Sequence, residues 1–268
     1  MNLMTALDTT VDAANVVLPS GLRIRYLHGG AQGGPVVLML HGLGDSSGSY
    51  RRILPLLPPH LRFIAIDQRG HGDSDRPVSG YSMDDLAGDA IDVLDELGIE
   101  HAVLVGHSMG SFVARKVAER DPHRVERLVL IGTALRPRNA VLSELRTVFD
   151  ALSDPVSEPF IREFQMSCVN RTVPAEFMNA IIADSAKVPA RVWRAALEGL
   201  WRFEARWPLT VPTVIVGGDK DAIFNRAEQA ALFAATERSA LHLEPDIGHC
   251  LHWEAPARFV QLAFDVVE

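Results

Sequence analysis

Short apolar runs alternate with amphipathic segments along most of the chain. Residues 16–18 and 22–26 flank a Pro-Ser-Gly turn and are expected to form a hairpin, because the second arm alternates apolar and polar positions. Residues 35–40 (PVVLML) form a continuous apolar run, a pattern typical of a strand that is covered on both faces. Further strands are predicted at residues 61–66, 102–105, 128–131, 213–216 and 241–243.

Helical periodicity appears between these strands. In residues 83–97 it places five apolar residues on one face, and Gly98 is expected to end the helix. The five are Leu86, Ala90, Val93, Leu94 and Leu97. Strands that alternate with helices are typical of βαβ units, so the pattern predicts an α/β protein with a mostly parallel sheet. The other expected helices are residues 49–57, 108–120, 227–235 and 256–267.

The alternation stops between residues 136 and 208. Only helical patterns occur there, and prolines separate them. Four helices inserted between two strands cannot lie within a sheet, so we expect a separate layer over it; the alternative is a long crossover packed on one face. The prediction divides the chain into an α/β core, residues 1–135 and 209–268, and an all-helical cap, residues 136–208. The expected cap helices are residues 141–152, 158–168, 174–187 and 189–203.

Composition narrows the class of protein. The 268 residues are 47% hydrophobic and 22% charged, which is ordinary for a globular chain and excludes disorder as the main state. A length of 268 residues suits one large domain or one domain with an insertion. The 26 basic residues are outnumbered by 34 acidic ones, so a nucleic acid is not expected as a partner.

Cysteine content and hydropathy suggest a compartment. Cys168 and Cys250 cannot form a disulfide framework, which favours a reducing environment. The start of the sequence lacks a basic segment followed by an apolar one, and the longest clean apolar run, residues 36–40, is far below the ~20 residues that a membrane helix needs. A cytoplasmic protein without a membrane partner is expected; its oligomeric state is not predicted.

A pentapeptide motif marks the candidate nucleophile. The strand at residues 102–105 leads into Gly106-His107-Ser108-Met109-Gly110, which opens a helix. This is G-x-S-x-G between a strand and a helix. So sharp a turn forces Ser108 into strained backbone angles, and glycines are needed on either side because the chain passes close to itself. The helix N-terminus favours negative charge near the serine, and the plain alternative is a glycine-rich turn with an N-capping serine.

A serine nucleophile needs a base. Of the ten histidines, His249 follows the last expected strand and precedes the last helix. It therefore falls at the carboxyl edge of the sheet, the same edge as Ser108, where ligands of open α/β sheets bind. His252 is the reserve candidate.

A carboxylate should orient the base. The strand at residues 213–216 is followed by Gly217-Gly218-Asp219-Lys220-Asp221, again at the carboxyl edge. Asp219 and Asp221 are both available, and their spacing does not choose between them. The order serine, acid, histidine along the chain matches this arrangement.

An oxyanion hole completes the chemistry. One donor is the backbone N–H of Met109, the residue after the nucleophile. The second should come from the loop after the strand at residues 36–40, which reads His41-Gly42-Leu43-Gly44. Glycines let the backbone approach a ligand closely, so the N–H of Leu43 is the expected second donor; the alternative is an ordinary strand-to-helix turn.

Five motifs in this order resemble the α/β-hydrolase family across nearly the whole chain. The resemblance implies an eight-stranded, mostly parallel sheet with a helical cap, and a triad of Ser108, Asp221 and His249. It also implies that residues 67–74 shape the fold near the site and take no part in catalysis. Haloalkane dehalogenases and epoxide hydrolases of this family carry Asp as the nucleophile, so Ser108 argues against both. The motifs are residues 41–44, 67–74, 106–110, 218–221, and 248–249 followed by 254–256.

The expected reaction is acyl transfer through an acyl-enzyme, for which no metal or organic cofactor is needed. Aromatic residues of the expected cap suggest a partly apolar pocket for a small-molecule substrate, with Phe149, Phe164 and Trp193 as candidate lining residues. The predicted function is therefore a serine hydrolase of small to medium carboxylic esters or lactones.

Two alternatives remain open. One is a carbon–carbon bond hydrolase of meta-cleavage-type vinylogous diketone acids, which the same family contains. It would be favoured by a cap arginine in the pocket, for which the candidates are Arg191, Arg194 and Arg202. The other is a ligand-binding receptor on a hydrolase scaffold.

Overall fold

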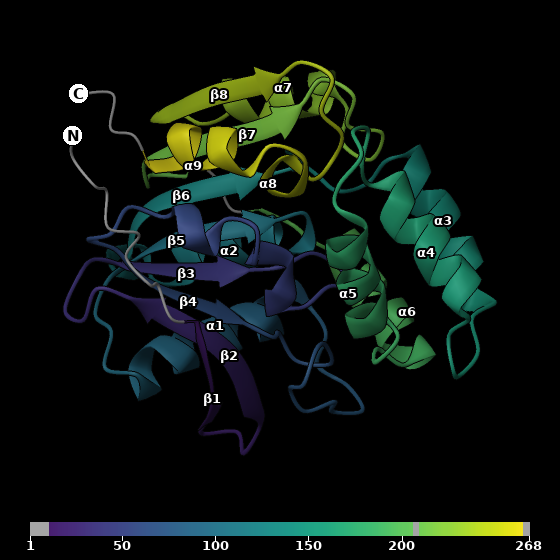
Figure 1. Cartoon of the computed structure of the whole chain (residues 1–268), viewed down its shortest axis with the longest axis horizontal. Coiled ribbons are helices and arrows are strands. Elements are labelled where there is room, and N and C mark those ends of the chain that lie inside the picture. Colours follow the sequence, from purple (N-terminus) through teal and green to yellow (C-terminus); the bar gives the residue numbers. More distant parts are fainter. Residues whose placement is uncertain (1–10, 206–208, 265–268) are drawn as a thin grey trace, which may run out of the picture.

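One mixed sheet forms the centre of the molecule (Figure 1). Its strands are β1 (Asp12–Val17), β2 (Arg23–Gly30), β3 (Val36–Leu40), β4 (Arg62–Ile66), β5 (Ala102–His107), β6 (Val125–Ile131), β7 (Thr213–Gly218) and β8 (Ser239–Glu244). The computed structural model describes residues 11–205 and 209–264, and these contain eight strands in the order β1-β2-β4-β3-β5-β6-β7-β8. β4, β3, β5, β6, β7 and β8 run parallel to one another, whereas β2 pairs antiparallel with both of its neighbours, β1 and β4. The predicted α/β class, mostly parallel sheet and hairpin are confirmed.

Helices cover both faces of this sheet. They are α1 (Met83–Glu96), α2 (Met109–Arg120), α7 (Arg226–Ala234), α8 (Leu251–Glu254) and α9 (Pro256–Phe264). Leu38 and Leu40 of β3 belong to one apolar cluster, together with residues of α1 and α2. Val37 and Met39 belong to a second cluster, which contains residues of α9. Every residue of β3 is therefore buried, as its continuous apolar run predicts.

Helix α1 begins and ends where its sequence predicts. The Ser82 hydroxyl accepts a hydrogen bond from the Asp85 N–H, and the Asp85 carboxylate accepts one from the Ser82 N–H. This capping box satisfies two N–H groups that the first turn leaves unpaired. Gly98, with φ of 63°, follows the helix in the left-handed conformation. Four of the five residues of the predicted apolar face are buried, whereas Leu97, just after the helix, is half-buried.

The helix predicted at residues 49–57 is absent. The segment instead contains two short 3-10 helices, η1 (Ser47–Tyr50) and η2 (Leu54–Leu56). Pro55 lacks the N–H that an α-helix would require at that position, so one continuous helix cannot form. The prediction was wrong because the apolar periodicity of the segment resembles that of a helix, whereas Pro55 interrupts it. A third 3-10 helix, η3 (Pro122–Arg124), precedes β6.

Four helices lie between β6 and β7: α3 (Ala140–Asp150), α4 (Glu158–Ser167), α5 (Ala175–Ser185) and α6 (Ala190–Trp201). α3 packs against α6, and α4 packs against α5. They form a group beyond the ends toward which the arrows of β3 and β6 point (Figure 1). The segment therefore adds no strand to the sheet in its described residues and lies over the carboxyl edge, where the candidate nucleophile is located.

Two predicted boundaries lie outside the described residues. The predicted end of the cap at residue 208 is one, and the predicted end of the last helix at residue 267 is the other. The division into core and cap stays a prediction. No helix within residues 11–205 and 209–264 is long and apolar enough to cross a membrane.

Candidate active site

Ser108 occupies a strained turn between β5 and α2. Its φ of 49° and ψ of −118° lie in a region that residues with a side chain rarely adopt. Such a conformation costs about 1–3 kcal/mol and persists only where neighbours enforce it. The Ser108 N–H donates to the Ile131 carbonyl at 2.9 Å, and the Ser111 hydroxyl donates to the Ser108 carbonyl at 2.6 Å. These contacts hold a partly exposed serine at the N-terminus of α2.

The two glycines of the motif are required by contact distances. A Cβ atom at Gly106 would lie 2.4 Å from the Gly110 carbonyl oxygen. A Cβ atom at Gly110 would lie 1.9 Å from the Leu40 carbonyl oxygen. Both neighbours are backbone atoms that cannot rotate away. The structure thus supports the physical reason for glycine at each position.

We expect Gly110→Ala to lower the free energy of unfolding by about 3 kcal/mol or more, because the new methyl group would push α2 away from β3. Urea unfolding followed by circular dichroism measures the change. Gly98→Ala is the matched control: a Cβ there meets no atom within 4 Å, so only its φ of 63° is unfavourable. We expect that variant to lose about 1 kcal/mol. Equal losses in the two variants would contradict the steric explanation.

His249 and Asp221 form a buried hydrogen-bonded pair. The two atoms that join them, His249 Nδ1 and Asp221 Oδ2, are 2.8 Å apart. The other carboxylate oxygen of Asp221, Oδ1, accepts the N–H groups of Ile223 at 2.8 Å and Phe224 at 2.9 Å. An ionised carboxylate only accepts, so the proton of the neutral imidazole is on Nδ1 and Nε2 is free to take a proton.

The environment of His249 raises its basicity. Burial alone lowers the pKa of His249, but the negative charge of Asp221 and its hydrogen bond outweigh this effect and raise the pKa above 6.5. His249 Nε2 is buried and has no hydrogen-bond partner within the described part of the chain. It does not contact Ser108 at hydrogen-bond distance, although both residues line the same pocket. Such bonds often tighten only when substrate binds.

The two reserve candidates lie elsewhere. Asp219 accepts the N–H of Asp246 at 2.8 Å, which stabilises the loop after β8. His252 is buried with its Nε2 3.1 Å from the Ser49 hydroxyl. Asp221 and His249 are therefore the pair that the structure brings together.

Two residues that support His249 were missed in the sequence. The His249 N–H donates to the Cys168 carbonyl at 2.9 Å, which ties the imidazole-bearing loop to the end of α4. Gly132, at the end of β6, has φ of 54°, and a Cβ there would lie 2.7 Å from His249 Nδ1. A glycine directly after a parallel strand was the available sign, since that position lies at the same edge as Ser108.

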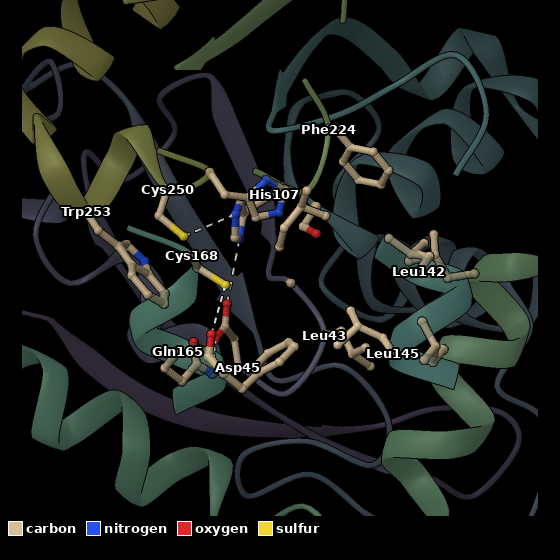
Figure 2. Close-up of a pocket in the computed structure, with 17 residues that line it drawn as sticks. Leu43, Asp45, His107, Leu142, Leu145, Gln165, Cys168, Phe224, Cys250 and Trp253 are labelled. Carbon is tan, nitrogen blue, oxygen red and sulfur yellow. Dashed lines mark hydrogen bonds and ion pairs between the residues drawn. The ribbon is translucent and has the colours of Figure 1, made fainter. Parts of the chain in front are cut away.

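One pocket contains both Ser108 and His249 (Figure 2). Including its opening to solvent, it encloses about 450 Å³. The inserted helices α3 and α6 contribute apolar side chains, among them Leu142, Leu145 and Leu197. The pocket is therefore closed by both the sheet edge and the inserted helices.

The three candidate substrate-binding residues have different surroundings. Phe164 lines this pocket, whereas Phe149 and Trp193 do not. Trp193 is fully buried and packs edge-on against Phe149 and Phe164, with ring centroids 5.3 and 5.1 Å apart. A Cβ at Gly44 would lie 2.1 Å from the Trp193 ring. Trp193 thus supports the backbone of the candidate oxyanion loop instead of facing the pocket.

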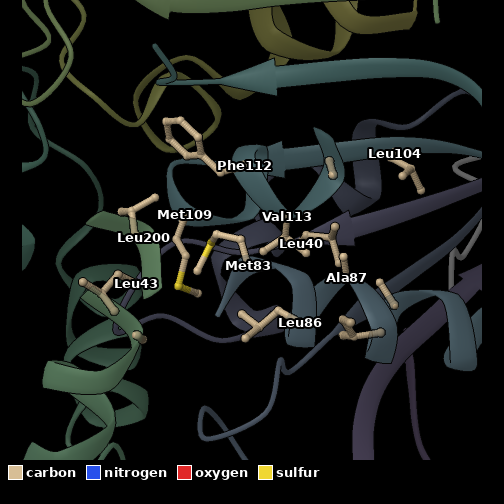
Figure 3. Close-up of a cluster of buried hydrophobic side chains, with 14 of the residues drawn as sticks. Leu40, Leu43, Met83, Leu86, Ala87, Leu104, Met109, Phe112, Val113 and Leu200 are labelled. Carbon is tan, nitrogen blue, oxygen red and sulfur yellow. The ribbon is translucent and has the colours of Figure 1, made fainter. Parts of the chain in front are cut away.

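The backbone around the candidate oxyanion hole is fixed on both sides. The Gln68 N–H donates to His41 Nε2 at 3.0 Å, so the imidazole Nδ1 donates to the Gly42 carbonyl at 2.8 Å. The Met109 side chain is buried below the serine turn in a cluster that includes Leu43 and Met83 (Figure 3). Within residues 11–205 and 209–264, the N–H groups of Leu43 and Met109 donate to no other residue. Both donors are therefore available to a ligand.

Comparison with known proteins agrees with this geometry. A family model for the alpha/beta hydrolase fold matches residues 35–256. The 2-hydroxymuconate semialdehyde hydrolase of Pseudomonas sp. strain CF600 is 30% identical to the chain, with 98% of the chain and 96% of that enzyme covered.

Solved structures show the same architecture. An esterase from Exiguobacterium antarcticum superimposes with a TM-score of 0.80 at 22% identity, covering 92% of this chain and 96% of that one. The enol-lactonase from Burkholderia xenovorans LB400 has a TM-score of 0.79 at 20% identity, covering 94% and 98%. At these sequence identities the structural likeness establishes the fold alone. The family model, which spans most of the sequence, establishes the family. The chain belongs to the α/β-hydrolase family, and this membership indicates that the protein is a hydrolase.

Proposed function

We propose that the protein is a serine hydrolase that cleaves small to medium carboxylic esters or lactones through an acyl-enzyme. The observation that carries the proposal is the His249–Asp221 pair, whose histidine lines one pocket with Ser108 and Leu43. The N–H groups of Leu43 and of Met109, the residue after Ser108, have no partner among the described residues. A base, its orienting acid, a strained serine and two oxyanion donors are the parts that acyl transfer requires.

The mechanism follows from these positions. His249 Nε2 takes the hydroxyl proton as Ser108 Oγ attacks the substrate carbonyl carbon, and Asp221 stabilises the imidazolium that forms. The Leu43 and Met109 N–H groups stabilise the oxyanion. The imidazolium then protonates the leaving alcohol, or the ring oxygen of a lactone. Water, activated by the same imidazole, attacks the acyl-enzyme and releases the carboxylic acid and Ser108.

The four inserted helices act as a lid in this proposal. Three of them supply pocket side chains: α3 supplies Leu142, α4 supplies Phe164, and α6 supplies Leu200. A pocket built jointly by core and lid excludes water from the ester carbonyl and so strengthens the hydrogen bonds and charge interactions within the site. This supports the predicted division into core and cap.

The charge of the pocket favours a neutral substrate. No arginine or lysine of the described residues lines the pocket, whereas the carboxyl group of Asp45 does. The cap arginines are engaged elsewhere: Arg191 donates to the Pro77 carbonyl, Arg194 to the Leu152 carbonyl, and Arg202 to Glu198. An anionic substrate would find no partner of opposite charge.

The alternative is hydrolysis of a carbon–carbon bond in a vinylogous diketone acid. It is favoured by the 30% identity to the 2-hydroxymuconate semialdehyde hydrolase. The same serine, histidine and aspartate serve both reactions, so the choice rests on how the substrate is bound. The lack of a cationic partner in the pocket ranks this alternative second.

A substrate panel tests the proposal. We expect 4-nitrophenyl esters of two to six carbons, or neutral lactones, to be hydrolysed with a kcat/KM at least about tenfold above that of a ring-fission diketone acid. A higher kcat/KM for the diketone acid would instead establish the carbon–carbon hydrolase. Ligand-induced thermal stabilisation without turnover of any substrate would overturn both and favour a receptor.

A further inference from the structure

Asp45 is a buried carboxyl group of the pocket that the proposed triad does not use. It follows the candidate oxyanion loop directly and is only 3% exposed. Its Oδ1 accepts from Gln165 Nε2 at 3.0 Å, and its Oδ2 accepts from the Ser49 hydroxyl at 3.5 Å. Both donors are neutral, and the second bond is long. A buried carboxylate in apolar surroundings ordinarily has a cationic partner or several short hydrogen bonds, which offset the free-energy cost of removing its charge from water.

Two other buried carboxylates of this region have stronger partners. Asp67 accepts the Ser47 N–H at 2.7 Å and the Asp73 N–H at 2.8 Å. Asp221 accepts two backbone N–H groups and His249. An ionised carboxylate can accept about four hydrogen bonds. Asp45 accepts two, and the bond to its Oδ2 is the longest of these at 3.5 Å, so Oδ2 retains accepting capacity.

The nearest histidine does not neutralise Asp45. His107 Nδ1 is 3.6 Å from Asp45 Oδ2 and has no hydrogen-bond partner among the described residues. Burial and the neighbouring His249 lower the pKa of His107 well below 6.5, so its ring is uncharged at neutral pH. Burial raises the pKa of Asp45 to about 6, which leaves it mainly ionised at pH 7.5. Its charge thus has no cationic partner in the described pocket lining.

Gln165, in helix α4 of the proposed lid, places a second polar side chain beside Asp45. Its side chain is buried, and Nε2 is shared between Asp45 Oδ1 and the Ser185 hydroxyl at 2.9 Å. In Figure 2, Asp45 and Gln165 lie on one side of the pocket, and Leu142, Leu145 and Phe224 lie on the other. A substrate in this pocket therefore meets an accepting group on one side and hydrocarbon on the other.

We propose that Asp45 determines substrate specificity by accepting a hydrogen bond from a hydroxyl group of the ester or lactone. The proposal rests on the hydrolase function proposed above and names its substrate class: a neutral ester or lactone that carries a hydroxyl group on one side of the reacting carbonyl. A hydroxyl group would supply a second, shorter hydrogen bond to Asp45 Oδ2, whose one donor, the Ser49 hydroxyl, is 3.5 Å away. A methyl group in its place would leave the carboxylate buried without this donor.

Substrates that exchange hydroxyl for methyl test the proposal. On the acyl side, 4-nitrophenyl 3-hydroxybutanoate is compared with 4-nitrophenyl 3-methylbutanoate; on the alcohol side, 2-hydroxyethyl butanoate is compared with propyl butanoate. We expect the wild-type kcat/KM to favour the hydroxylated member of at least one pair by about 10- to 100-fold, as for a hydrogen bond to a charged group. Ratios near one in both pairs would overturn the proposal, whether or not any variant folds.

Asp45→Asn should bring the favoured ratio down by at least about tenfold. Asp184→Asn is the matched control: its carboxylate accepts from Ser46 at 2.6 Å, another loop–lid contact, yet Asp184 does not line the pocket. It should leave the ratio unchanged. If Asp45 were only structural, Asp45→Asn would slow both members of a pair equally, and the ratio would not move.

The pH dependence of the same ratio is a separate measurement. His41, His107 and His249 surround Asp45, and titration of the catalytic base affects both members of a pair alike, so it cancels in the ratio. We expect the preference to increase as pH rises through about 6, where Asp45 ionises. A ratio independent of pH would contradict a carboxylate acceptor. If the wild type hydrolyses neither an ester nor a lactone, the proposed function itself fails.

Discussion

Ser108→Ala should abolish hydrolysis, with kcat reduced at least about 10⁴-fold and up to about 10⁶-fold, because in the proposed mechanism the acyl-enzyme forms on the Ser108 hydroxyl. The same variant should lose covalent labelling by a fluorophosphonate probe. In that reaction Ser108 Oγ bonds to phosphorus, fluoride leaves, and His249 takes the hydroxyl proton. In-gel fluorescence and intact mass measure the label. The substitution removes one oxygen from a partly exposed side chain, so we expect the fold to persist.

Ser111→Ala is the matched control for this experiment. Ser111 lies in the first turn of α2, and its hydroxyl donates to the Ser108 carbonyl at 2.6 Å. Its loss should weaken the turn but leave a labelled protein. Labelling that persists in Ser108→Ala would show that the nucleophile lies elsewhere in the chain. Loss in both variants would point instead to collapse of the turn, which circular dichroism would detect.

Much of the site follows from the sequence because parallel strands end at one edge. Once β5, β7 and β8 were identified, the residues after them had to meet there, and Ser108, Asp221 and His249 do lie at that edge. What spacing could not decide was Asp219 against Asp221. That choice depends on the turn geometry, in which Asp219 binds the backbone of Asp246.

Contacts between the core and the inserted helices were not predictable in this way. Asp45 and Gln165 are 120 positions apart and belong to different elements, and no periodicity relates them. The aromatic residues of the inserted helices show the same limit. Phe149 and Trp193 share helical spacing with pocket residues, yet packing against Gly44 directs Trp193 to the loop backbone. Side-chain direction in an inserted layer depends on the layer beneath it.

Asp221→Asn should reduce kcat by about 10⁴-fold while leaving the fold intact. The reason lies in the two backbone N–H groups, of Ile223 and Phe224, that donate to Asp221 Oδ1. An asparagine would keep its oxygen toward them and turn its NH₂ group toward His249 Nδ1. That nitrogen must then accept, so the imidazole proton moves to Nε2. A base protonated at Nε2 cannot take the proton of Ser108.

The pH profile separates this explanation from a general loss of structure. In the wild type the charge of Asp221 outweighs burial and raises the pKa of His249, so activity should fall as pH is lowered through a value above 6.5. Without that charge, the acidic limb of the residual activity in Asp221→Asn should shift to lower pH. Asp219→Asn is the control, because an amide oxygen can still accept the Asp246 N–H. It should change kcat less than about tenfold and leave the acidic limb in place. The reverse order of effects would assign the orienting acid to Asp219.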